Sequence, residues 1–102
     1  DRAAQAQKLL HLSNQVTEPD DLCIICGDFN VRPESETLSI LAAAGLVELV
    51  AHHGFSSTRS SYYKKPEKFA DYMLINQLND VRNFQVVREP EVSDHCPLVL
   101  EL

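Results

Sequence analysis

The sequence lacks several features that would place it in a specialised class of protein. No apolar run approaches the ~20 residues that a membrane-spanning helix requires, and residues 1–10 form no signal peptide. Basic residues are in deficit, with 9 against 15 acidic residues and a formal charge of −6, so nucleic-acid binding would need a locally basic patch. We therefore expect a cytoplasmic protein with no membrane partner.

Cysteine is also scarce. The chain has three cysteines, an odd number that fits a reducing compartment better than a disulfide framework. Cys23 and Cys26 have the CxxC spacing of zinc and redox sites, but residues three apart in a strand point to opposite faces. We therefore interpret them as two small buried hydrophobic residues. His52 and His53 have no further ligand at a useful spacing for zinc.

What remains is the composition of an ordinary globular protein. The 102 residues, 44% hydrophobic and 24% charged, are enough for one domain with a single modest core. Apolar periodicity predicts helices at residues 2–16 and 35–44. Strands are predicted at residues 22–27, 69–76, 81–87 and 97–102, with a short extended segment at 46–50 and a long loop at 52–68. The alternation of helices and strands predicts an α/β fold.

The strand at residues 22–27 is an unbroken apolar run. Such runs are typical of strands that are buried on both faces in a mixed or parallel sheet, and we expect that environment for it.

Polar side chains gather at the ends of these strands, where α/β proteins place their ligands. Asp28 and Asn30 are two residues apart, so an extended backbone would leave both on the same side. Asp71 lies in an otherwise apolar strand, where a buried carboxylate needs a partner such as a histidine. Asp94 and His95 together would supply a carboxylate for a cation and an imidazole for proton transfer.

Each of these groups also has a structural interpretation. Asp28 and Asn30 alone could form an ordinary Asx turn, which we favour equally with a site. Asp94 alone could cap a turn, and a lone His95 or Asp71 is more often structural than catalytic. Only the combination favours a functional site.

The loop at residues 56–68 carries the one basic and aromatic cluster of the chain. Within it Arg59, Tyr62 and Lys64 are candidate substrate-binding residues, because they could attract an anion or stack on a base or sugar. A solvated, mobile loop is an equally good interpretation.

Three motifs follow one another in order: GDFN at residues 27–30, DY at 71–72 and SDHCPL at 93–98. They resemble the GDFN, DY and SDHxPL motifs of the endonuclease/exonuclease/phosphatase (DNase I-like) superfamily, and their spacing is similar. Arg2, Gln5 and Leu9 are similar to the R-x-x-Q-x-x-x-L helix that precedes GDFN in that superfamily. The resemblance implies a hydrolase of phosphodiesters or phosphomonoesters that requires Mg²⁺ or Mn²⁺.

The resemblance also implies residue roles. Asp28 and Asn30 would orient the attacking water and the scissile phosphate, and Asp94 would help to bind the cation. His95 would contact or protonate the phosphate, and Asp71 would orient His95. The superfamily acts on DNA, RNA, inositol phosphates and sphingomyelin, so the resemblance implies a phosphate-ester substrate, nucleic acid included, without selecting one.

Superfamily members also carry an asparagine and a metal-binding glutamate near the start of the domain, and a histidine before the helix at residues 2–16. None of these can be located here. We therefore interpret residues 1–102 as the C-terminal half of the domain, a mixed sheet with two helices on one face, and expect this piece alone to be inactive.

In the whole fold of this superfamily two sheets pack face to face. A half domain would expose the inner face of its sheet near Leu22, Tyr72 and Leu98, and we expect self-association through that face. The alternative function, of a different class, is a catalytically silent association module.

Overall fold

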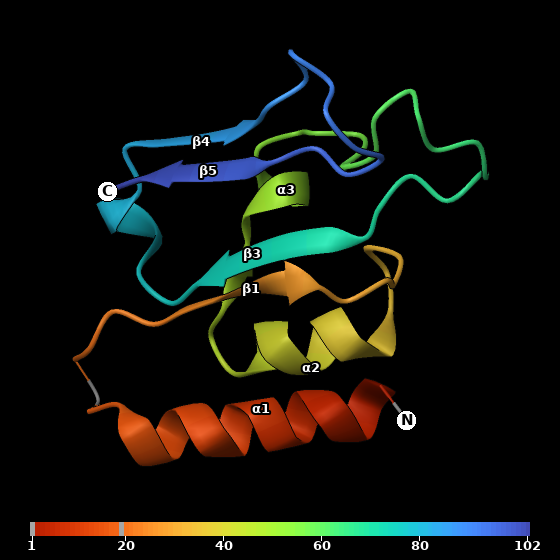
Figure 1. Cartoon of the computed structure of the whole chain (residues 1–102). Helices are drawn as coiled ribbons and strands as arrows, with labels where there is room; N and C mark the ends of the chain where they lie inside the picture. The colour runs from red at the N-terminus through yellow and green to blue at the C-terminus, as the bar shows by residue number, and fades with distance from the viewer. Residues whose placement is uncertain (1, 19) are drawn as a thin grey trace.

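The structure is a computed structural model and describes residues 2–18 and 20–102. Its elements, in chain order, are α1 (Arg2–Val16), β1 (Ile24–Asp28), α2 (Glu36–Ala43), β2 (Val47–Glu48), α3 (Leu49–His52), β3 (Asp71–Ile75), a 3₁₀ turn (Leu78–Asp80), β4 (Asn83–Val86) and β5 (Leu98–Glu101). The predicted α/β class is confirmed, with α1 and α2 lying side by side below β1 and β3 in Figure 1. None of the helices described is long and apolar enough to cross a membrane.

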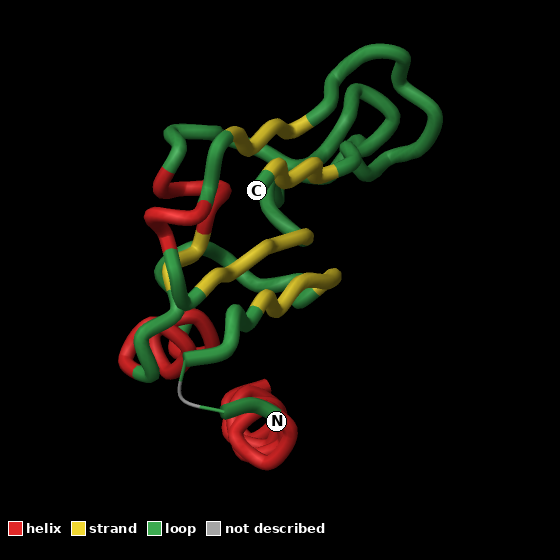
Figure 2. Tube along the Cα trace, turned by 90° about the vertical axis from the view of Figure 1, so that its left-hand side faces the viewer, coloured by secondary structure: helices red, strands yellow, loops and turns green. Residues whose placement is uncertain are grey.

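Helix α1 covers the same residues as the predicted helix and buries the predicted stripe. Ala6 is buried, and Leu9 and Leu10 are half-buried against the core. Figure 2 looks along this helix and shows that it lies at one end of the molecule, away from the strands of β4 and β5.

Helix α2 begins and ends where its flanking residues predict. The Ser35 hydroxyl accepts a hydrogen bond from the Leu38 N–H at 3.3 Å, which makes Ser35 the N-cap. Gly45 follows the helix with φ of 92°, the left-handed conformation that favours glycine after a helix C-terminus. Leu38 and Leu41 are then directed into the core.

Strand β3 is the middle strand of an antiparallel sheet with the order β1-β3-β2, and β4 pairs antiparallel with β5. Directly paired residues of antiparallel strands place their side chains on the same face. Ile25 therefore shares the core face of the sheet with its partner Leu74, and both are buried. The opposite face, here called the open face, carries Ile24, Cys26, Asp28, Asp71 and Met73, together with Ile75, which is buried.

The burial of β1 differs from the prediction. Only Ile25 of this strand is buried, whereas Ile24 is 38% exposed and Cys26 is exposed. The cause is that β1 lies at the edge of its sheet and that the described residues leave one of its faces uncovered. The interpretation of Cys23 and Cys26 as buried hydrophobic residues was therefore wrong, since Cys23 is half-buried and Cys26 lies on the open face.

Tyr72 was predicted on the exposed face of the sheet and is instead fully buried on the core face. Its ring lies between those of Phe29 and Phe69, with centroid distances of 6.1 and 6.3 Å. Its hydroxyl donates a hydrogen bond to the Val31 carbonyl at 2.6 Å. Burial raises the pKa of Tyr72 because the phenolate would lose its solvation there.

The extended segment predicted at residues 46–50 is only partly extended. Strand β2 has two residues, and the chain then turns into the short helix α3. The Glu48 carboxylate accepts hydrogen bonds from the N–H groups of Val50 and Ala51 at 2.5 and 2.9 Å, and this cap starts the helix. Burial raises the pKa of Glu48, while these two N–H groups act in the opposite direction.

Candidate active site

Two carboxylates face each other at one end of the sheet. Asp28 is the last residue of β1, Asp71 is the first residue of β3, and the two are direct partners in the antiparallel register. Because paired residues share a face, both side chains lie on the open face. Like charges in such a pair repel each other, so the arrangement favours a cation between them.

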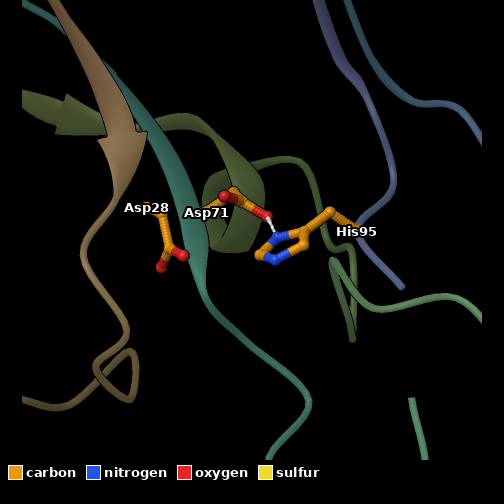
Figure 3. A group of neighbouring side chains, drawn as sticks. All are labelled: Asp28, Asp71 and His95. Carbon is orange, nitrogen blue, oxygen red and sulfur yellow. Dashed lines mark hydrogen bonds and ion pairs between the residues drawn. The ribbon is translucent and has the colours of Figure 1, made fainter. Parts of the chain in front are cut away.

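His95 completes this group from a distant part of the chain. One ligand atom from each of Asp28, Asp71 and His95 lies within 4.8 Å of the others. Figure 3 shows Asp71 between Asp28 and the imidazole. The Nδ1 atom of His95 is 2.6 Å from Oδ2 of Asp71, whose side chain is 19% exposed. The predicted histidine partner for Asp71 is therefore present.

Arg59 occupies the other side of the imidazole. Its Nη1 atom is 3.1 Å from Nε2 of His95, and a guanidinium can only donate a hydrogen bond. Nε2 must then accept, and Nδ1 must carry the proton that it donates to Asp71. The contacts of the ring therefore favour the tautomer with Nδ1–H and with a lone pair on Nε2.

The backbone around His95 is held by two short segments that pair with each other. Residue His95 forms an antiparallel bridge with Arg59, and the Cys96 N–H donates to the Thr58 carbonyl at 2.8 Å. Ser93 closes a turn, since its hydroxyl accepts from the His95 N–H at 3.0 Å and donates to the His95 carbonyl at 3.0 Å. The SDH motif is thus a tight turn fixed against the loop of residues 57–60.

Asp94 lies beside this group but outside it. Its carboxylate is 3.6 Å from Nη1 of Arg59 and 3.8 Å from Nε2 of His95, and it is 49% exposed. The three-residue cluster that could hold a cation therefore contains Asp28, Asp71 and His95 and does not include the predicted ligand Asp94.

Asn30 follows Asp28 closely, but the two are not related by an extended backbone. Asn30 has φ of 49°, a left-handed conformation that asparagine tolerates better than most residues. The N–H groups of Phe29 and Asn30 both donate to the Ala70 carbonyl, at 2.9 and 3.1 Å. The strand ends at Asp28, so the extended backbone from which a shared side for Asp28 and Asn30 was predicted does not reach Asn30.

The predicted substrate-binding residues separate into two groups. Arg59 reaches His95, and its guanidinium carbon is 3.9 Å from the centroid of the Tyr63 ring. Tyr62 instead donates its hydroxyl to the Glu91 carbonyl at 3.1 Å, and the Lys64 ammonium donates to the Ser61 carbonyl at 2.9 Å. Tyr62 and Lys64 are exposed and stabilise the loop that contains them.

Two residues that the sequence did not single out organise the site. The Thr58 hydroxyl accepts hydrogen bonds from the N–H groups of Ala70 and Asp71 at 3.1 and 3.3 Å, so Thr58 joins the start of β3 to the His95 turn. Arg88 donates to the carbonyls of Ser57 and Arg59 at 2.5 and 2.7 Å. A threonine in a polar loop and an arginine after a strand give no sequence signal for such contacts.

One comparison with known proteins identifies a family for this chain. A sequence model described as the Endonuclease/Exonuclease/phosphatase family matches residues 1–95, nearly the whole chain. Comparisons with curated proteins and with solved structures each returned no match.

Proposed function

Since the chain belongs to the endonuclease/exonuclease/phosphatase family, we propose that it carries the aspartate–histidine part of a metal-dependent phosphoesterase active site. The observation that supports this most is the convergence of Asp28, Asp71 and His95 from separate segments within 4.8 Å. Structural acids and histidines have no need to converge in this way, whereas hydrolysis of a phosphate ester needs a charge-neutralising cation and a proton-transfer group together.

The donor chemistry of the group fits a hard divalent cation. Asp28 is exposed and Asp71 still has one carboxylate oxygen that accepts no hydrogen bond from His95. Carboxylate oxygens are preferred by Mg²⁺ and Mn²⁺, which neutralise phosphate charge when bound. The family resemblance assigns this role to Asp94, which would have to exchange its ion pair with Arg59 for the cation.

We infer that His95 acts at its Nε2 atom. Asp71 holds the ring through Nδ1–H, as a buried carboxylate does when it fixes the tautomer of a catalytic histidine. Nε2 then carries no proton, and it can accept one when the Arg59 N–H releases the Nε2 lone pair. Arg59 places positive charge beside the same atom, where a phosphate would develop negative charge.

We also propose what completes the site and which substrate it takes. The family pattern has a further metal-binding glutamate that no residue here matches, so we propose that the site is completed by sequence beyond residues 1–102. The substrate is a phosphate ester, and the overall charge of −6 favours small phosphate esters over bulk nucleic acid.

A second function, a catalytically silent association module, is supported by the open face. Ile24 is 38% exposed and Cys26 is exposed on this face, which is an apolar surface that a partner sheet would cover.

The test is cation-dependent cleavage of a generic phosphodiester by the 102-residue chain and by the full-length protein, with Mg²⁺ and with Mn²⁺. We expect activity in the longer protein that His95→Ala abolishes. His11→Ala, which removes an exposed histidine of α1, is the matched control and should leave activity unchanged. Folded full-length protein that cleaves no phosphate ester with either cation would refute the enzyme and support the silent module.

A further inference from the structure

A hollow of about 610 Å³ lies beside Arg59 and contains none of Asp28, Asp71 and His95 in its lining. Its walls are formed by serines and cations only: Ser56, Ser57, Arg59, Ser60, Ser61, Lys68 and Arg88. No carboxylate lines it, although the chain as a whole has a charge of −6 and only nine lysines and arginines. Three of those nine cations therefore gather around one volume, which is large enough for a small ligand.

Two of the three cations of this hollow form no ion pair with a carboxylate of the described residues, whereas Arg59 is paired with Asp94 at 3.6 Å. Among the described residues, Lys68 and Arg88 have no carboxylate within ion-pair distance, and Arg88 is held by the carbonyls of Ser57 and Arg59. Glu91 lies near enough to Arg88 to feel its charge, but its carboxylate accepts hydrogen bonds from Ser61 and does not line the hollow. Such a concentration of unpaired positive charge attracts anions.

Arg59 also holds a buried polar group near the hollow. Its side chain is only 9% exposed, and its Nε–H has no hydrogen-bond partner among the described residues. Buried N–H groups in proteins are usually paired, so this one is available to an anion or a water that reaches it.

Arg59 also connects the hollow to the candidate active site. Arg59 lines the hollow, and its guanidinium contacts Nε2 of His95 at 3.1 Å. An anion in the hollow would therefore lie one residue away from a phosphate at His95, an arrangement that suits two phosphates of the same small molecule.

We propose that this hollow is a second anion subsite, which binds a non-reacting phosphate of a substrate that carries at least two phosphate groups. The proposal rests on the proposed phosphoesterase function for its substrate, but not for the binding of the anion itself. Arg59 and Arg88 bind through charged N–H groups, with Lys68 as a mobile ammonium at the rim, and the scissile phosphate lies at His95.

The binding test uses inorganic phosphate in metal-free buffer at constant ionic strength, followed by NMR. We expect saturable shifts of the amides of Ser56, Ser57 and Lys68 and of the Arg59 Nε–H. Lys68→Gln should weaken phosphate binding about tenfold, because a hydrogen bond to a charged group contributes about 1.5–3 kcal/mol. Lys65→Gln is the control, since Lys65 is an exposed lysine of the same loop that does not line the hollow.

Three results would overturn the subsite. One is an equal loss of binding in Lys65→Gln and Lys68→Gln, and another is a set of shifts confined to Asp28, Asp71 and His95. An absence of saturable shifts would overturn it as well.

A kinetic comparison separates this proposal from the proposed function. In the active full-length protein, Lys68→Gln should raise KM for a bisphosphorylated substrate about tenfold and leave KM for the matching monophosphate unchanged. Equal effects on the two substrates would count against the subsite. Saturable phosphate binding in the hollow of a protein that hydrolyses nothing would refute the phosphoesterase and leave the anion subsite standing.

Discussion

Because Asp28 and Asp71 are paired, we expect one substitution to change folding stability in opposite directions without and with a bound cation. Asp28→Asn removes one of two like charges that face each other across β1 and β3. Without a cation this relief should stabilise the folded protein by about 0.2–1 kcal/mol, the range for cross-strand pairs. With a cation bound, the same substitution removes a ligand and should destabilise the protein relative to the wild type.

The stabilisation that the variant loses in the presence of the cation can be calculated from binding linkage. A cation that binds only the folded state stabilises it by RT ln(1 + [L]/Kd), or about 1.4 kcal/mol at tenfold excess over Kd. Asp28→Asn should lose most of this gain. The stability order of wild type and variant therefore reverses between chelator and Mg²⁺ or Mn²⁺.

The assay is urea denaturation followed by circular dichroism. Low ionic strength is needed, because the Debye length rises from about 10 Å at 0.1 M to about 30 Å at 0.01 M salt. Asp80→Asn is the matched control, since Asp80 is exposed and follows β3 at the end opposite Asp71. If Asp28→Asn gained as much stability from the cation as Asp80→Asn does, the carboxylate pair would not be a cation site.

Two further predictions concern the two faces of the sheet. Tyr72→Phe should destabilise the protein by about 1–3 kcal/mol at neutral pH, because the Val31 carbonyl loses its hydroxyl donor. The folded-state pKa of Tyr72 is raised above the usual 10, so this tyrosine contributes stability that is complete below pH 10 and is lost as the pH rises further. Urea titrations at several pH values should therefore show that the free energy of unfolding falls less steeply above pH 10 in the variant than in the wild type. On the open face, the isolated chain should sediment as a dimer or larger assembly, and Ile24→Lys should sediment as a monomer; a monomeric wild type would contradict the role of this face in association.

The elements that the sequence predicted well are those whose signal is local. The apolar stripe of α1, the Ser35 cap of α2 and the alternation of Leu98 and Leu100 in β5 each depend on residues a few positions apart. The partnership of Asp71 with His95 was also predictable, because a half-buried carboxylate requires a donor.

The features that the sequence predicted poorly depend on contacts between segments that are distant along the chain. The unbroken apolar run of β1 says nothing about whether a neighbouring layer covers its second face, and the described residues leave that face open. The position of Asn30 follows from a turn that the Ala70 carbonyl stabilises across 40 residues. Arg88 acquires its contacts only when the loop at residues 57–59 folds against it.

The long loop that begins at residue 56 is anchored at its base and exposed beyond it. Thr58 links the base to the start of β3 and to the turn that carries His95, whereas residues 64–68 are exposed to solvent. Substitutions in the exposed part can therefore accumulate without shifting the reacting groups. Such a division would let the exposed residues vary while the groups around His95 keep their positions, and it marks residues 64–67 as the segment to randomise when engineering altered selectivity, since the Lys68 carbonyl accepts from the Thr58 N–H.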